Sequence, residues 1–269
     1  MIKPSFFTDE VSEDLERAVM LGAEAGATHV ELRGALFGKN VTTIDEEDVL
    51  RIKEILGKYG LSCGVIGSPF GKCNHNDERA KEAHLSMFER MIRIARSLGA
   101  KAIRGFAFWN PGGRSRPNRP RIEEYMEVIV PFISPAARMA HENGLTFVLE
   151  TEEDTLVGTC EEARKVIEAV GEKGIGICWD LLNAWRSGEP PYPDGYEGSK
   201  GLIRHLHIKP NSSGNMKTIG ESDISYKAIF ELILADGYDG FATIEHWGSP
   251  PAMLRGIREL VSVISELQP

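Results

Sequence analysis

The 269-residue chain lacks the features of several protein classes. No apolar run reaches the ~18 residues that a membrane-spanning helix needs, and the opening MIKPSFFTDE has no apolar segment of signal-peptide length. The four cysteines form no CxxC pair and no spacing typical of a disulfide framework. These absences are typical of a protein from a reducing cytoplasm, and we expect a cytoplasmic protein without a membrane segment.

An excess of positive charge is also absent. The chain has 31 Lys and Arg against 40 Asp and Glu, which gives a formal net charge of -9. Because affinity for nucleic acid depends on neutralising phosphates, this balance argues against a nucleic-acid partner. It is compatible with a local basic pocket for a small anion. Nothing in the composition decides the oligomeric state, and a homo-oligomer is as compatible with it as a monomer.

Strand-like and helix-like segments alternate along the whole chain. Strands are expected at residues 3–10, 28–34, 61–69, 100–108, 145–152, 174–180, 202–209 and 241–247. Helices are expected at residues 12–26, 45–59, 76–98, 121–143, 159–171, 223–236 and 251–267, with a proline-rich, weakly helical segment after the sixth strand. Ser12 is expected to cap the first helix, and a glycine ends several others.

Eight such units in this length predict a single-domain (β/α)₈ TIM barrel over residues 1–269. A doubly wound open sheet is the alternative, but no strand is followed by a GxGxxG phosphate loop. In a barrel, the active site lies at the carboxyl ends of the strands. Polar residues gather at these ends: Glu31, Arg33, Arg104, Glu150, Glu152, Asp180, His205, His207, Lys209 and Glu245.

Several carboxylates at one barrel mouth would repel one another without a compensating cation. Carboxylates with one imidazole suit one divalent ion, such as Mn²⁺, Mg²⁺, Co²⁺ or Zn²⁺. We therefore predict a metal site formed by Glu150, Asp180, His207 and Glu245. His205 shares a face with His207 but lies deeper in the strand, where a buried histidine behind the site is expected.

Four short motifs carry a resemblance to a known family. They are VLETE with Glu150, WDLLN with Asp180, HIKP with His207 and TIEHW with Glu245. In this order they resemble the metal-dependent sugar isomerases and epimerases among the xylose isomerase-like (β/α)₈ barrels, and the similarity covers essentially the whole chain. Two positions depart from the family pattern. Asn183 stands where a substrate-contacting histidine is common, and Pro210 replaces the usual aspartate.

The resemblance implies that Glu150 and Glu245 are both metal ligands and the catalytic acid/base pair. Removing a proton next to a carbonyl creates an enediolate, whose negative charge a metal stabilises. Carboxylates on both substrate faces would give epimerisation, and transfer along one face would give isomerisation. The substrate would be a ketose, a sugar acid or a related polyol ketone. Residues expected to contact it are Arg33, Lys72, Arg104, Trp109, Glu152, Asn183 and Lys209.

Three alternatives stay open at this stage. A metal-dependent lyase or dehydratase would begin with the same proton abstraction and then expel a leaving group. A nuclease acting on abasic DNA shares the fold family, but it needs several zinc ions and more histidines than this chain offers. His29, His84 and His141 are expected at a strand start and in helices. A non-catalytic binding protein is disfavoured because both glutamates are present.

Overall fold

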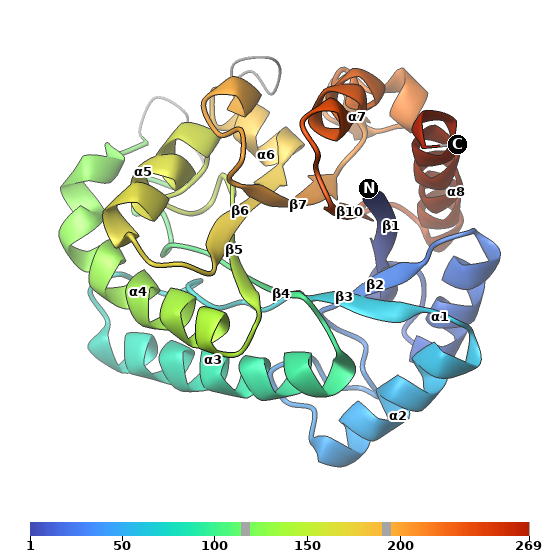
Figure 1. The fold of residues 1–269 in the computed structure, drawn as a ribbon, viewed down its shortest axis with the longest axis horizontal. Helices are drawn as coiled ribbons and strands as arrows, with labels where there is room; N and C mark the ends of the chain where they lie inside the picture. The colour runs from blue at the N-terminus through green and yellow to red at the C-terminus, as the bar shows by residue number, and fades with distance from the viewer. Residues whose placement is uncertain (114–118, 190–194, 269) are drawn as a thin grey trace. The chain divides into compact units, whose positions relative to one another are not determined.

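The computed structural model describes residues 1–113, 119–189 and 195–268. Within these residues, eight parallel strands form a closed barrel in the order β1-β10-β7-β6-β5-β4-β3-β2 (Figure 1). The (β/α)₈ fold predicted from the sequence is therefore confirmed. The described chain divides into two compact units. Unit 1 comprises Met1–Ile66, Ser97–Ala100 and Arg204–Pro269, and unit 2 comprises Gly67–Arg96 and Lys101–Ile203.

Unit 1 contains both ends of the chain. Its strands are β1 (Ile2–Phe7), β2 (His29–Leu32), β3 (Ser62–Ile66), β10 (Gly240–Ile244) and all but the first residue of β7 (Ile203–Ile208). Its helices are α1 (Leu15–Glu24), α2 (Glu46–Lys58), α7 (Tyr226–Ala235) and α8 (Pro250–Leu267). The Gln268 side chain joins the ends, because it accepts the N–H of Ile2 at 2.8 Å and donates to the Ile2 carbonyl at 3.1 Å.

Unit 2 contains the parallel strands β4 (Ala102–Gly105), β5 (Thr146–Glu150) and β6 (Ile175–Asp180). Its helices are α4 (Met126–Glu142), α5 (Cys160–Val170), α6 (Leu181–Arg186) and most of α3 (Glu78–Leu98). Helices α4 and α5 pack against β5 and β6 (Figure 1). Phe70 stacks on Phe132 with ring centroids 4.8 Å apart and meets Phe88 at 4.8 Å. Burying each ring contributes roughly 2–3 kcal/mol, so this cluster holds α3 and α4 together through Phe70.

Several local expectations need correction. Asp14, and not Ser12, caps α1: the Asp14 carboxylate accepts the N–H of Arg17 at 2.9 Å, and the Ser12 hydroxyl accepts the N–H of Asp14. The helix begins later because its buried face starts at Leu15. The end of the expected first strand forms instead a 3₁₀ turn, Thr8–Glu10. The proline-rich segment at 190–193 lies outside the described residues, although α6 precedes it.

A hairpin after β7 was not expected. It pairs β8 (Asn211–Ser212) with β9 (Asn215–Met216) in antiparallel fashion. Its turn residues, Ser213 and Gly214, have φ of 51° and 83°. Positive φ at both central positions is the two-residue hairpin geometry, and the Ser-Gly pair was its sequence signal.

Glycine was correctly predicted at helix ends, where Gly26, Gly60, Gly99 and Gly144 all have positive φ. Among the described residues, no helix combines the length and the apolar character required to cross a membrane.

Candidate active site

In unit 1, β7 and β10 bring His207 and Glu245 together. The two strands pair in parallel, with His207 opposite Thr243, and the N–H of Glu245 donates to the carbonyl of Ile208 at 3.0 Å. His207 Nδ1 lies 3.5 Å from Glu245 Oε2, and both residues are buried. When two donor atoms bind the same ion, each at about 2.1 Å, the two atoms lie roughly 3.0–3.4 Å from each other. This separation suits a pair of ligands to a shared metal ion.

Glu31 lies on the other side of the His207 ring. Its Oε2 atom is 2.8 Å from His205 Nε2 and 3.1 Å from His207 Nε2, and all three side chains are fully buried. Burial alone would raise the pKa of the Glu31 carboxyl, but the two facing histidines lower that pKa well below its ordinary value. The structure confirms that His205 is buried behind His207.

Arg33 holds the second oxygen of Glu245. Its Nη1 donates to Glu245 Oε1 at 2.9 Å, while the rest of the guanidinium binds Asp9 and Glu10 at distances from 2.9 to 3.3 Å. The same group lies over the rings of Phe7, at 4.1 Å, and Trp247, at 4.9 Å. Burial would lower the pKa of Arg33, but Glu245 and the other carboxylates raise it. Arg33 therefore stays charged and orients Glu245.

Glu10 fixes the segment that follows Glu245. Its Oε2 accepts the N–H of His246 at 2.8 Å and that of Trp247 at 3.0 Å. Burial and the neighbouring Glu245 raise the pKa of Glu10 above its usual range, although Arg33 opposes this shift. Trp247 has a φ of 52° and is 65% exposed. Glu10 thus helps to hold a strained backbone that leaves an indole ring available at the surface.

Lys209 and Pro210, which follow β7, are the last two residues of the candidate site in unit 1. Lys209 Nζ lies 3.2 Å from Glu245 Oε2, and the main-chain N–H of Lys209 donates to the Tyr226 hydroxyl. The carbonyl of Pro210 accepts the N–H of Lys217, so this position starts the β8–β9 hairpin. Pro210 lacks the carboxylate of the family pattern, and its main-chain carbonyl supports the loop that follows β7.

In unit 2, Arg104 and Glu150 form a buried ion pair. Arg104 lies on β4 and Glu150 ends β5, and Arg104 Nη1 donates to Glu150 Oε2 at 3.0 Å. Arg104 is 6% exposed and Glu150 is 1% exposed. A buried carboxylate needs such a partner to stay ionised. The pair parallels that of Arg33 and Glu245 in unit 1.

Asp180 ends β6 and caps α6. Its Oδ1 accepts the N–H of Asn183 at 2.9 Å, while its own N–H donates to the Thr151 hydroxyl at 3.0 Å. Asn183 is 3% exposed, and its side-chain Nδ2 meets no hydrogen-bond acceptor within the described residues. The position that departs from the family pattern therefore presents a buried amide donor.

Lys72, Trp109 and Glu152, which the sequence predicts to contact substrate, lie together in unit 2. Lys72 Nζ is 3.2 Å from Glu152 Oε2 and lies over the rings of Phe106, at 4.2 Å, and Trp109, at 5.3 Å. Trp109 is 36% exposed. A cation, a carboxylate and an exposed indole are suited to the hydroxyls and the apolar face of a sugar-like ligand.

The family described as "Xylose isomerase-like TIM barrel" matches residues 19–266. The chain belongs to the xylose isomerase-like TIM barrel family. No curated protein matches it.

Solved structures share the fold of this xylose isomerase-like chain at low sequence identity. A xylose isomerase-like TIM barrel protein from Mycobacterium smegmatis in complex with magnesium is 19% identical, with a TM-score of 0.79, and covers 100% of this chain and 97% of its own. The 3-keto-D-glucoside 4-epimerase from E. coli is 17% identical, with a TM-score of 0.78, over 98% and 100%. A probable 3-DHS dehydratase from Bacillus anthracis is 18% identical, with a TM-score of 0.77, over 98% and 99%.

In this family member, Glu150 and Asp180 of unit 2 are buried, as are His207 and Glu245 of unit 1, and all four are residue types that could hold a metal ion. Three carboxylates and one imidazole are the donors predicted from the sequence, and they suit hard or borderline divalent ions. Their role as ligands stays a prediction. Sequence reasoning missed Asp9 and Glu10, whose signal was the acidic pair directly after the first strand, and gave Glu31 no role.

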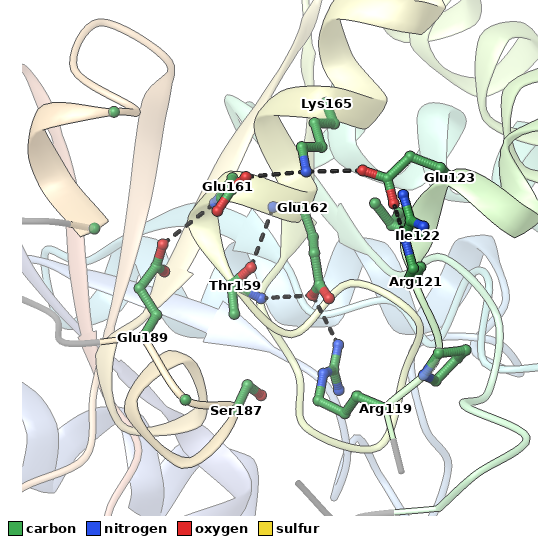
Figure 2. Close-up of a pocket in the computed structure, with 14 residues that line it drawn as sticks. Arg119, Arg121, Ile122, Glu123, Thr159, Glu161, Glu162, Lys165, Ser187 and Glu189 are labelled. Carbon is green, nitrogen blue, oxygen red and sulfur yellow. Dashed lines mark hydrogen bonds and ion pairs between the residues drawn. The ribbon is translucent and has the colours of Figure 1, made fainter. Parts of the chain in front are cut away.

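A cavity of about 740 Å³ lies elsewhere in unit 2. Figure 2 shows Lys165 between Glu123 and Glu161, and Arg119 against Glu162, at distances from 2.7 to 2.9 Å. The lining residues include none of the predicted catalytic, metal or substrate residues. Because Arg119 and Lys165 are already paired with carboxylates, neither cation is available to bind an anionic ligand.

Proposed function

We propose that this chain is a divalent-metal-dependent isomerase or epimerase acting on a ketose, a sugar acid or a related polyol ketone. One observation carries the proposal: two buried glutamates stand at strand ends, and each is paired with an arginine of its own unit, Glu150 with Arg104 and Glu245 with Arg33. Membership of the xylose isomerase-like family supports it.

Glu150, Asp180, His207 and Glu245 would hold the ion. The chemistry of this donor set fits Mn²⁺, Mg²⁺, Co²⁺ or Zn²⁺, and the similar protein from Mycobacterium smegmatis is in complex with magnesium. A bound ion would polarise the substrate carbonyl and lower the energy of the negative charge that develops on its oxygen. His207 Nδ1 and Glu245 Oε2, 3.5 Å apart, provide adjacent donors.

The two glutamates would move the proton. A carboxylate can act as a base only when it is ionised, and the ion pairs with Arg104 and Arg33 favour that form. One glutamate would take the proton from the carbon next to the carbonyl. The other would return a proton to the opposite face in an epimerisation, whereas an isomerase would return it to the neighbouring carbon.

The remaining residues would bind the substrate. Lys72 and Glu152 can hydrogen-bond to hydroxyls, and the indole of Trp109 can cover an apolar sugar face. Asn183 supplies a buried amide donor, and Lys209 supplies a cation beside Glu245. Arg33 and Arg104 would act mainly by orienting the glutamates.

A metal-dependent dehydratase is the second candidate. This second candidate is supported by the fold that the chain shares with the probable dehydratase from Bacillus anthracis. Both candidates begin with removal of the same proton and differ in whether a hydroxyl then leaves.

Deuterium exchange tests both candidates. Purified enzyme with Mn²⁺ is incubated in D₂O with a panel of ketoses, sugar acids and polyol ketones, and NMR follows exchange next to the carbonyl. Glu150→Gln should reduce exchange by roughly 10²–10⁴-fold. Glu172→Gln, which alters an exposed pair with Arg138, should not. Exchange with recovered or epimerised substrate supports the isomerase, and loss of water supports the dehydratase. Equal exchange by Glu150→Gln and the wild type would remove the proposed role of Glu150.

A further inference from the structure

We infer that Glu31 is a positioning residue that holds His207 in the tautomer able to bind a metal through Nδ1. The inference rests on the proposed metal site, and it assigns a role to a residue outside the four predicted ligands. A ligating histidine needs its lone pair directed at the ion, and a partner on its other nitrogen decides where the proton resides.

One carboxylate oxygen of Glu31 accepts hydrogen bonds from two imidazoles. Its Oε2 is 2.8 Å from His205 Nε2 and 3.1 Å from His207 Nε2. An ionised carboxylate can only accept hydrogen bonds, so both Nε2 atoms must carry a proton. A neutral His207 then has its lone pair on Nδ1.

Nδ1 of His207 faces Glu245, which is one of the proposed metal ligands. His207 Nδ1 lies 3.5 Å from Glu245 Oε2, on the side of the ring away from Glu31. Neighbouring rings fix this orientation. Phe7 meets the His207 ring edge-on with centroids 5.3 Å apart, and His205 does so at 4.9 Å. Rotation of the imidazole is therefore opposed by packing as well as by the hydrogen bond.

The burial of Glu31 is costly for a purely structural residue. The side chain is fully buried, and its Oε1 meets no hydrogen-bond donor within the described residues. An apolar side chain at this position in β2 would avoid the desolvation of a charged group. One oxygen of this buried carboxylate meets no hydrogen-bond donor within the described residues, and the other accepts hydrogen bonds from two histidines. This arrangement fits a role in setting which nitrogen of each histidine carries the proton.

The test combines a direct tautomer measurement with metal affinity. Long-range ¹H–¹⁵N NMR of metal-free wild-type protein at pH 8, assigned with His207→Asn, should show the His207 proton on Nε2. Titration with Mn²⁺ and with Co²⁺ should show roughly 10–100-fold weaker binding by Glu31→Gln. An amide can accept at its oxygen but donates at its nitrogen, so this variant should also place part of the His207 proton on Nδ1. Glu16→Gln, which changes an exposed pair with Lys58, is the control.

The outcomes separate this inference from the proposed function. A wild-type protein that binds metal, beside a Glu31→Gln variant that binds it equally well, overturns the role of Glu31 alone. A His207 proton found on Nδ1 in the wild type does the same, and it needs no folded variant. If the wild type binds neither Mn²⁺ nor Co²⁺, the proposed metal site fails and this inference fails with it.

Discussion

Arg33 Nη1 donates to Glu245 Oε1 at 2.9 Å, and the same guanidinium also binds Asp9 and Glu10. One cation therefore compensates three carboxylates at the end of the barrel strands in unit 1. Contact between this arginine and substrate stays a prediction, and in the structure its hydrogen bonds go to protein carboxylates. Its contribution to turnover would then come from keeping Glu245 ionised and in place.

Replacing Arg33 should cost stability in a pH-dependent manner. Arg33→Met leaves three neighbouring carboxylates without their shared cation, and we expect a loss of roughly 3 kcal/mol in the free energy of unfolding at pH 8. Arg33 lowers the pKa of Glu10, so its removal raises that pKa further. A raised folded-state pKa adds stability as the pH falls through it, and the deficit should therefore shrink by pH 5.

Urea unfolding in EDTA measures this effect. Arg51→Met is the matched control, because Arg51 also lies over an aromatic ring, Phe37 at 3.8 Å, but is largely exposed. It should change stability by no more than about 0.5 kcal/mol. A deficit for Arg33→Met that is equal at pH 5 and pH 8 would contradict the carboxylate network as its cause.

Metal binding should stabilise the wild type and not Asp180→Asn. At about 100 times its dissociation constant, a ligand specific for the folded state adds about 2.7 kcal/mol to the free energy of unfolding. Asparagine caps a helix as well as aspartate does, so the substitution preserves the start of α6 and removes the charged ligand. Chemical unfolding with and without Mn²⁺ provides the measurement.

Asp239→Asn is the control for this experiment, since Asp239 is an exposed partner of Lys3. Mn²⁺ should stabilise this variant as it does the wild type. If Asp180→Asn gains the same stability from Mn²⁺, Asp180 is not a ligand.

The sequence was sufficient for the barrel because its signals are local. Apolar strands buried on both faces and glycines such as Gly26 and Gly144 recur along the chain, and each can be recognised within a few residues. Pairings between distant side chains have no such signal. Arg33 and Glu245 are 212 residues apart, and Lys72 and Glu152 are 80 apart. Residue types at strand ends could therefore be predicted, whereas their partners could not.

The thiol of Cys73 should react slowly with alkylating reagents at neutral pH. Burial and the neighbouring Asp77 raise its pKa to about 11. Only the thiolate reacts, so labelling at pH 8 should be roughly 100 times slower than for a thiol with a pKa near 9. The rate should rise about tenfold per pH unit and level off only near pH 11. Site-resolved mass spectrometry after iodoacetamide treatment measures it, and a plateau at pH 9 would contradict the shift.

Gly71 should be irreplaceable for reasons of space. It has a φ of 86°, and a Cβ atom there would lie 1.9 Å from the carbonyl oxygen of Phe106. At Gly99, where φ is 73°, an added Cβ atom would have no other atom within 4 Å, so Gly99→Ala measures the cost of the backbone conformation without a steric clash. We expect Gly99→Ala to lose about 1–2 kcal/mol of stability and Gly71→Ala to lose more than about 4 kcal/mol. Because Lys72 is the next residue, any folded Gly71→Ala protein should also bind substrate more weakly. Urea midpoints that are equal for the two variants would show that the Phe106 carbonyl can move aside.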